Sequence, residues 1–360
     1  MAFGKHAVVV GAGIIGASIA WHLAAAGARV TVIDAGEAGG VATPNSFAWI
    51  NASWGNPEPY FRLRIRAMAE WRRLAAAVPG LSLAWTGGLC WDLPPAELDA
   101  YAREHAAWGY GIRRVDRAEA ARIEPSLAEW PELALHVAEE GAVEPRTAAL
   151  ALLQDARRRG ARVRQRVAVT ALAERNGAIV GVETSVGRLD ADAVVVAAGA
   201  GTPTLAASVG VALPMTAPPG LLIHSRPHAR LLNGLVLAPD AHLRQTVEGR
   251  IVAGADFAGD DPGETPDEAA RALFERAKAM LRGADGLALA FHTVGYRPTP
   301  ADGFPVICRV PGHQGLYVAV MHSGITLAPA VGLFAAEELL IDRRDPLLAP
   351  YGPARFAGAP

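Results

Sequence analysis

Cysteine and net charge are both scarce in this chain of 360 residues, and each absence excludes a class of protein. The two cysteines, Cys90 and Cys308, cannot form a framework of disulfide bridges and have no metal-ligand spacing. We therefore expect no metal site, and this cysteine usage fits a reducing, cytoplasmic location. The formal net charge of −2 provides no basic field for nucleic acid or for an anionic membrane.

Lysine is scarce as well, with only Lys5 and Lys278 among the 34 basic residues, and we attribute this to genome base composition. What remains is the composition of a globular protein. Hydrophobic residues make up 51% of the chain, which is enough for sizeable cores, and charged residues make up 19%, which is too little for disorder. Because the length exceeds twice that of a usual domain, we predict two domains.

The strongest positive signal is the stretch from Ala7 to Asp34, which reads AVVVGAGIIGASIAWHLAAAGARVTVID. It begins with β-branched residues that suit a buried strand. Three glycines then follow in the spacing G-x-G-x-x-G. Gly11 allows a tight turn, Gly13 lets the backbone approach a pyrophosphate, and Gly16 lets a helix pack close to the strand. The pattern therefore predicts the strand, turn and helix that bind an adenine dinucleotide.

The rest of this stretch supplies the context that the glycine motif requires. Residues Ile14 to Ala26 predict a helix whose N-terminal N–H groups and positive dipole end face the phosphates. Residues Arg29 to Ile33 predict the second strand, and Asp34 follows it. A carboxylate at this position can accept a hydrogen bond from a ribose 2′-OH and would repel a 2′-phosphate. We expect Ile14, Ile15 and Ala35 to line the same site.

Two uncharged runs also resemble membrane or targeting segments. Residues 7–28 match a transmembrane span, or a signal peptide with Lys5 in its basic region. The glycine spacing and the strand that follows favour the nucleotide site. Residues 315–341 are broken by a histidine, a glycine and a proline, so they predict a strand, a loop and a buried helix. Pro329 is expected in the first turn of that helix.

Small polar residues and then an amphipathic helix follow the glycine motif. Asn45 and Ser46 lie in a loop after the second strand, where they either bind phosphate oxygens or belong to an ordinary loop. Residues 58–78 predict a helix whose apolar face includes Phe61, Ile65, Met68, Trp71 and Leu74. The arginines on its other faces, at positions 62, 66, 72 and 73, are expected to be solvated.

Two stretches differ from the surrounding pattern and divide the chain. Residues 81–142 concentrate aromatic side chains and prolines, and residues 214–255 alternate apolar and polar residues as antiparallel sheets do. We therefore predict an α/β fold, or α+β composite, with two domains and a loose C-terminal tail. The Rossmann-like nucleotide-binding domain is assembled from the discontinuous segments 1–80, 143–213 and 291–346, the antiparallel-sheet substrate domain from 81–142 and 214–290, and the tail from 347–360.

Four motifs occur in the order in which one known family has them. They are GAGIIG…VIDAG (11–36), VVVAAGA (194–200), GYRPTPADGFPVI (295–307) and GLYVAVMHSGITLAP (315–329). Together they resemble the D-amino-acid oxidase family of FAD-dependent oxidoreductases, nearest its glycine oxidase, sarcosine oxidase and D-amino-acid dehydrogenase branch. The first motif is shared by many nucleotide enzymes, so the two C-terminal motifs discriminate.

The resemblance implies that FAD binds along the nucleotide-binding domain. Sarcosine oxidases of this type carry a cysteine shortly before the segment that matches residues 296–302, and this chain has none there, so we expect noncovalent FAD. The implied contacts are Gly11, Gly13, Gly16 and Asp34 to the adenosine diphosphate half, Val169 to adenine, Ala198 and Gly199 beside the cofactor, and Gly324, Ile325 and Thr326 to the flavin pyrimidine edge.

The resemblance also implies residues that bind the substrate. Arg297 stands where glycine oxidases place the arginine that binds a substrate carboxylate; the alternative is a structural ion pair with Asp302. His322 stands where glycine oxidase has a second arginine, and it either contacts substrate or flavin or caps a loop. Three further candidates for the substrate pocket are Trp49, Asn51 and Arg244.

These features predict oxidation of the C–N bond of a small amino acid or secondary amine, of the glycine, sarcosine or D-amino-acid type. The product imine is then hydrolysed by water, and the electrons pass to O2 or another acceptor. Sarcosine oxidases keep a lysine over the flavin where we align Val252, which weakens the oxidase interpretation. Two alternatives are an NAD-dependent dehydrogenase on the same N-terminal fold and a flavin-bearing subunit that needs partner chains. A homo-oligomer is also compatible with the sequence.

Overall fold

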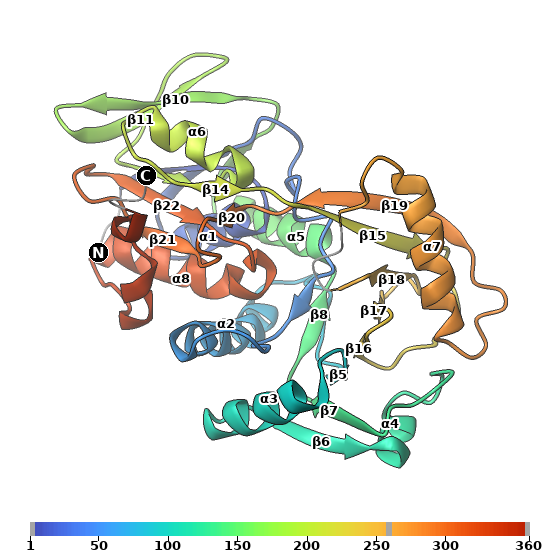
Figure 1. Cartoon of the computed structure of the whole chain (residues 1–360). Helices are drawn as coiled ribbons and strands as arrows, with labels where there is room; N and C mark the ends of the chain where they lie inside the picture. Colours follow the sequence, from blue (N-terminus) through green and yellow to red (C-terminus); the bar gives the residue numbers. More distant parts are fainter. Residues whose placement is uncertain (1–3, 257–260, 357–360) are drawn as a thin grey trace.

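The strand pair predicted from the glycine motif lies at the centre of a six-stranded sheet (Figure 1). The computed structural model describes residues 4–256 and 261–356. In spatial order the strands are β21 (Val306–Arg309), β22 (Leu316–Val320), β13 (Ala193–Val196), β1 (His6–Val10), β2 (Arg29–Ile33) and β9 (Arg162–Arg164). All neighbours run parallel except β21, which is antiparallel to β22. Three separate parts of the chain therefore build one sheet.

Helices cover one face of this sheet, and α1 lies between α5 and α8. A Cβ atom at Gly332 of α8 would lie 2.4 Å from Ser18 Oγ and from His22 Nδ1 of α1, so a glycine permits the close approach. A second small sheet and α6 cover the other face (Figure 1). The elements are α1 (Ile14–Ala25), α2 (Glu58–Ala77), α5 (Pro145–Arg158) and α8 (Gly324–Ile341) on the first face, and β10 (Val169–Arg175), β11 (Ala178–Thr184), β12 (Leu189–Asp190) and α6 (Thr202–Ala207) on the second.

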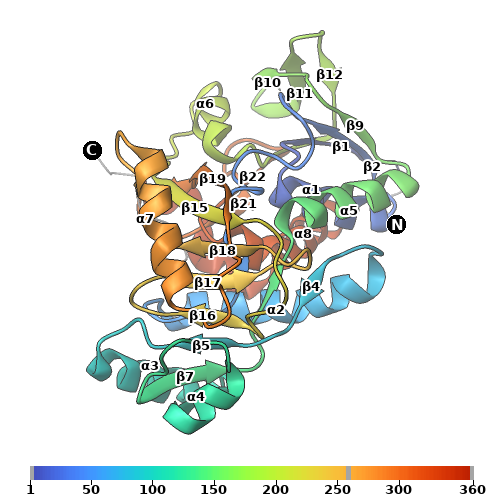
Figure 2. The same cartoon turned by 90° about the vertical axis from the view of Figure 1, so that its right-hand side faces the viewer.

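The predicted antiparallel region forms an eight-stranded sheet beside the first (Figure 2). Its order is β19 (Leu289–Tyr296), β15 (Pro219–Ser225), β18 (Ile251–Gly254), β17 (His242–Gln245), β16 (Leu235–Leu237), β5 (Gly88–Cys90), β7 (Leu133–Val137) and β6 (Ile112–Asp116). The β16–β5 pair is parallel and joins two distant chain segments into one sheet. The flanking helices are α3 (Pro95–Ala107), α4 (Arg117–Ile123) and α7 (Pro266–Ala279). The predicted mixed α/β class is confirmed.

Short elements connect the two large sheets and carry residues of the site. One three-stranded sheet pairs β3 (Trp49–Ile50), β8 (Gly141–Val143) and β4 (Leu83–Ala84), and a two-stranded sheet pairs β14 (Met215–Thr216) with β20 (Thr299–Pro300). Three 3₁₀ helices are η1 (Gly199–Gly201), η2 (Pro346–Tyr351) and η3 (Pro353–Phe356). The chain between β9 and β10 passes through Arg166, which has a positive φ of 58°.

Helix α8 begins earlier relative to Pro329 than the sequence predicts. The helix starts at Gly324, so the proline lies in its second turn and removes one internal hydrogen bond. The carbonyl left without that donor is Ile325 O, and the indole Nε1–H of Trp71 donates to it at 2.9 Å. Length and apolar composition alone would let α8 cross a membrane, but 72% of its 18 residues are buried in the structure. The predicted buried helix is therefore present, with its proline compensated by α2.

The C-terminal segment packs against the nucleotide-binding region, and the prediction of a loose tail is wrong for residues 347–356, whereas residues 357–360 of that tail lie outside the described residues. Leu348 is fully buried, and the ring of Tyr351 lies 6.1 Å from that of Tyr60 on α2. Arg355 donates to both carboxylate oxygens of Asp302, at 2.5 and 3.1 Å. Apolar burial and this ion pair dock a segment whose own sequence shows no regular periodicity.

Candidate active site

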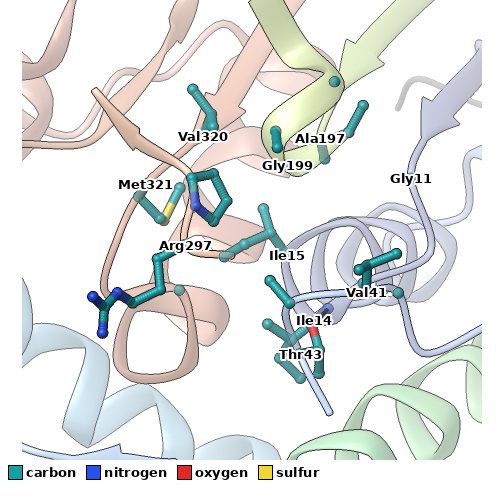
Figure 3. Close-up of a pocket in the computed structure, with 18 of the residues that line it drawn as sticks. Gly11, Ile14, Ile15, Val41, Thr43, Ala197, Gly199, Arg297, Val320 and Met321 are labelled. Carbon is teal, nitrogen blue, oxygen red and sulfur yellow. Dashed lines mark hydrogen bonds between the residues drawn. The ribbon is translucent and has the colours of Figure 1, made fainter. Parts of the chain in front are cut away.

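A cavity of about 940 Å³ runs along the carboxyl ends of β1, β2, β13 and β22. Ligands of open α/β sheets bind at this edge of the sheet. Asp34 and Val169 line one part of the cavity, and Arg297 and His322 line another. Figure 3 shows Gly11 and Val41 on one side of the view and the Arg297 side chain on the other, with Ile14 and Ile15 between them. The cavity therefore connects the glycine motif to the predicted substrate residues.

Glycine stands at the three positions of the motif for different structural reasons. A Cβ atom at Gly11 would lie 2.2 Å from Ala197 O, and one at Gly16 would lie 1.9 Å from Gly11 O, so both positions require glycine for packing. Gly13 is different, because its backbone is extended (φ −71°, ψ −179°) and accepts any residue. Its added Cβ would meet Thr43 Oγ1 at 3.3 Å. What glycine provides at this position is open space at the start of α1.

The Asp34 carboxylate is held in place by the loop that it borders. Oδ2 accepts the backbone N–H of Ala12 at 2.6 Å, and Oδ1 accepts that of Gly36 at 2.8 Å. Each oxygen keeps acceptor capacity for a further donor. Thr43 Oγ1 accepts the N–H of Ile14 at 3.0 Å, so the loop after β2 also closes over the start of α1.

Asn45 and Ser46 line the cavity, and their side chains bond the backbone of their own loop. Asn45 Nδ2 donates to Val41 O at 3.1 Å, and Ser46 Oγ accepts the N–H of Ala48 at 3.1 Å. This geometry favours the ordinary-loop alternative for both side chains. Ala35, Ala198 and Gly199 also line the cavity, and Gly199 has a positive φ of 56°.

The start of α8 meets β3 at the far part of the cavity. Gly324, Ile325 and Thr326 line it and open the helix, whose first N–H groups have no partner inside the helix. Thr326 Oγ1 donates to Trp49 O at 3.2 Å and accepts the N–H of Asn51 at 3.4 Å. The positive end of the α8 dipole is therefore fixed beside Trp49 and Asn51.

Arg297 and His322 both line this part of the cavity. Arg297 Nη2 donates to Pro219 O at 3.2 Å, while Asp302, its predicted alternative partner, bonds Arg355. Burial, followed by the charges of Arg297 and Arg64, lowers the pKa of His322 to about 4. The imidazole is therefore neutral at pH 7, unlike the arginine that the resemblance places there.

The sequence prediction missed Arg64, a side chain of α2 that lines the same cavity and is only 6% exposed. Its Nε donates to Asn51 O at 2.9 Å, and its Nη2 donates to Asn51 Oδ1. A signal was present, because Arg64 falls between Phe61 and Met68 in the apolar stripe of α2, where a charge has no place in a plain core. Thr43 and Arg146 also line the cavity, and the sequence prediction did not include them.

Arg244 lies elsewhere, in a second hollow of about 480 Å³ that Glu144 and Gln245 also line. Its Nη1 pairs with Glu144 Oε1 at 3.1 Å. The described lining of the larger cavity does not include Arg244, whereas Trp49 and Asn51 belong to it. The indole of Trp49 donates to the buried carboxylate of Glu140 at 2.8 Å.

Comparisons with known proteins give the family of this chain. The family model described as DAO, FAD dependent oxidoreductase, matches residues 6–338. The glycine oxidase of Pseudomonas putida is 31% identical, over 97% of this chain and 98% of that protein. One of the opine oxidase subunits of Agrobacterium tumefaciens is 25% identical, over 97% of this chain and 96% of its own.

Two solved structures share the fold along nearly the whole chain. The glycine oxidase of Geobacillus kaustophilus superposes with a TM-score of 0.87 at 26% identity, covering 98% of this chain and 99% of that one. The iminodiacetate oxidase of Chelativorans superposes with a TM-score of 0.82 at 27% identity, covering 96% and 98%. The chain therefore belongs to the DAO family of FAD-dependent oxidoreductases, and FAD is its cofactor.

Proposed function

We propose that this protein oxidises the C–N bond of a small amino acid or secondary amine, whose carboxylate binds Arg297. The observation that supports this most is the gathering of Arg297, the neutral His322 and the start of α8 around one part of the FAD cavity. The match to an FAD-dependent family argues against the NAD-dependent alternative.

The residues of the cavity fit FAD bound without a covalent link. The open space at Gly13 suits a pyrophosphate at the start of α1, and Asp34 suits the adenosine ribose. We assign Val169 to adenine and the Gly324–Thr326 turn to the flavin ring. Cys90 and Cys308, the only cysteines of the chain, are not among the described residues that line the cavity, and burial raises the pKa of Cys308 to about 12.

The chain's own groups perform three tasks in this proposal. FAD, when bound, accepts a hydride from the carbon beside the amine. The planar guanidinium of Arg297 holds the carboxylate by two parallel hydrogen bonds and so orients that carbon. The N–H groups at the start of α8 would stabilise the negative charge of the reduced flavin ring. One such donor contributes about 3 kcal/mol. Because His322 is neutral, it adds no third positive charge to those of Arg297 and Arg64. Water then hydrolyses the imine that the oxidation produces.

We infer that the electrons leave to O2 or to another carrier, and a partner subunit is one route to such a carrier. The opine oxidase relative, which resembles this chain along its length, is named as one subunit of its enzyme. Neither Lys5 nor Lys278 is among the described residues that line the cavity. Lys5 instead donates to Leu339 O at 3.2 Å.

An anaerobic titration of the purified holoenzyme tests the proposed function. Glycine, sarcosine or a small D-amino acid should bleach the visible absorption of the bound flavin, because without O2 the reduced flavin has no acceptor for its electrons. Readmitting O2 then measures reoxidation and separates an oxidase from a dehydrogenase. A flavin that dithionite reduces but that none of these amines reduces would contradict the proposal.

Replacing Asp34 by alanine should weaken FAD binding. The side chain is assigned to the ribose and also holds the N–H groups of Ala12 and Gly36. Hydrogen bonds to a charged group contribute roughly 1.5–3 kcal/mol, so the Kd should rise roughly 10- to 150-fold. Titration of apoprotein with FAD measures this. Asp190→Ala, in an exposed ion pair with Arg188, is the control and should leave the Kd unchanged.

A further inference from the structure

Arg64 is a buried cation that no carboxylate of the described residues approaches within ion-pair distance. Its neighbours on α2 have carboxylate partners, Arg62 with Glu58 and both Arg66 and Arg73 with Glu70. Arg64 is 6% exposed and uses Nε and Nη2 on the two carbonyl oxygens of Asn51. Burying a charge is costly unless an opposite charge accompanies it. Among the described residues, Arg64 therefore has no carboxylate partner.

Glu140, a buried acidic residue that lies within the electrostatic influence of Arg64, does not supply that opposite charge. The charge of Arg64 acts on Glu140, but this carboxyl group already accepts Trp49 Nε1 at 2.8 Å and the Tyr110 hydroxyl at 2.5 Å. Burial raises the pKa of Glu140 to about 8, so the group is mostly protonated at pH 7. A neutral carboxyl group at Glu140 does not balance the charge of Arg64.

Arg64 and Arg297 belong to the same part of the cavity but are fixed by separate elements. The charges of both lower the pKa of His322, and Asp256, which raises it, has a smaller effect than either. Arg64 is tied to the start of α8 through Asn51, whose N–H donates to Thr326 Oγ1. Arg297 is tied to Pro219 O at the start of β15. Two guanidinium groups that are fixed by separate elements thus line one chamber, where each can hold a carboxylate of its own.

We propose that the substrate is a secondary amine with two carboxylates, one on each side of the nitrogen, and that Arg64 binds the second carboxylate while Arg297 binds the first. This inference rests on the proposed function and names its substrate class. Hydride leaves a carbon between the nitrogen and one carboxylate, and the nitrogen lone pair forms the C=N bond. Water then adds to that carbon, and cleavage of the C–N bond yields an oxo acid and an amino acid.

Two matched substrates test this class. Sarcosine and iminodiacetate share the CH2–NH–CH2 core and differ by one carboxylate. In the wild-type holoenzyme, iminodiacetate should reduce the flavin anaerobically at least about tenfold more efficiently than sarcosine does. Arg64→Met keeps the unbranched stem but removes the guanidinium and its charge. Its efficiency should fall at least about thirtyfold with iminodiacetate and much less with sarcosine, because only the diacid contacts the second anchor. Arg64→Lys should be intermediate. Arg62→Met, on the exposed side of α2, is the control and should leave the efficiency with both substrates unchanged.

A pair of ligands that cannot be oxidised at nitrogen separates binding from chemistry. Thiodiacetate and (methylthio)acetate have sulfur in place of the amine, and calorimetry on the holoenzyme measures their Kd. Thiodiacetate should bind at least tenfold more tightly, and Arg64→Met should remove that difference while FAD content stays the same.

Three results overturn the inference. One is an equal loss of efficiency with both substrates in Arg64→Met, which would mean that both arginines hold the same carboxylate or that Arg64 is structural. Another is a wild-type preference for sarcosine, and the third is equal Kd values for the two sulfur ligands. If neither amine reduces the flavin of wild type, the proposed oxidation fails, and the calorimetry alone then decides whether Arg64 forms a second carboxylate site.

Discussion

Replacing Gly13 by valine should give a folded protein that binds no FAD. The backbone at Gly13 is extended, so valine causes no strain, and the new Cβ would lie 3.3 Å from Thr43 Oγ1. Its two methyl groups then occupy the space at the start of α1 where the pyrophosphate is expected. The visible absorption spectrum of the purified variant should show no flavin, while circular dichroism should match that of wild type.

The same substitution at Gly352 is the matched control. Its backbone is also extended (φ −81°, ψ 161°), and no atom lies within 4 Å of an added Cβ. Gly352→Val should therefore keep a full complement of FAD. A yellow Gly13→Val protein with one FAD per chain would contradict the assignment of the phosphate site. An unfolded Gly13→Val protein would mean that the glycine serves packing instead.

Replacing Arg297 should reduce amino-acid oxidation in the order wild type, lysine, alanine. Lysine keeps the charge but loses the planar fork, and alanine loses both. The cavity excludes more water than a surface does, so the alanine variant should lose near 3 kcal/mol of transition-state stabilisation, or about a hundredfold in kcat/KM. Anaerobic flavin reduction by sarcosine measures this. The visible spectrum and FAD content should stay unchanged, because Arg297 is assigned to substrate.

Dimethylamine, which is sarcosine without its carboxylate, shows whether the loss is specific. Its slow oxidation should fall far less in Arg297→Ala than that of sarcosine does. Arg309→Ala, in an exposed ion pair with Asp342, controls for the removal of an arginine and should behave as wild type. Loss of the flavin from Arg297→Ala would favour a structural role, and unchanged sarcosine turnover would place the carboxylate elsewhere.

The sequence by itself determined the strand, glycine turn, helix and second strand of the nucleotide site. These elements interact with neighbours along the chain: β1 pairs with β2, and Gly16 lets α1 pack on Gly11 five residues earlier. Local spacing and side-chain size therefore encode the whole unit. The order of the four motifs likewise identified the FAD-dependent family, which the family match confirms.

Only the tertiary structure decided which arginines reach the cavity. Arg64 and Arg244 are both buried, yet one lines the FAD cavity beside Asn51 and the other pairs with Glu144 in a separate hollow. Likewise, Trp71 compensates Pro329 across 254 residues of sequence from Ile325, and Arg355 holds the C-terminal segment on Asp302. The physical reason is that a buried polar group must find a partner wherever packing brings one. That partner is fixed by the meeting of distant segments, which local periodicity does not encode.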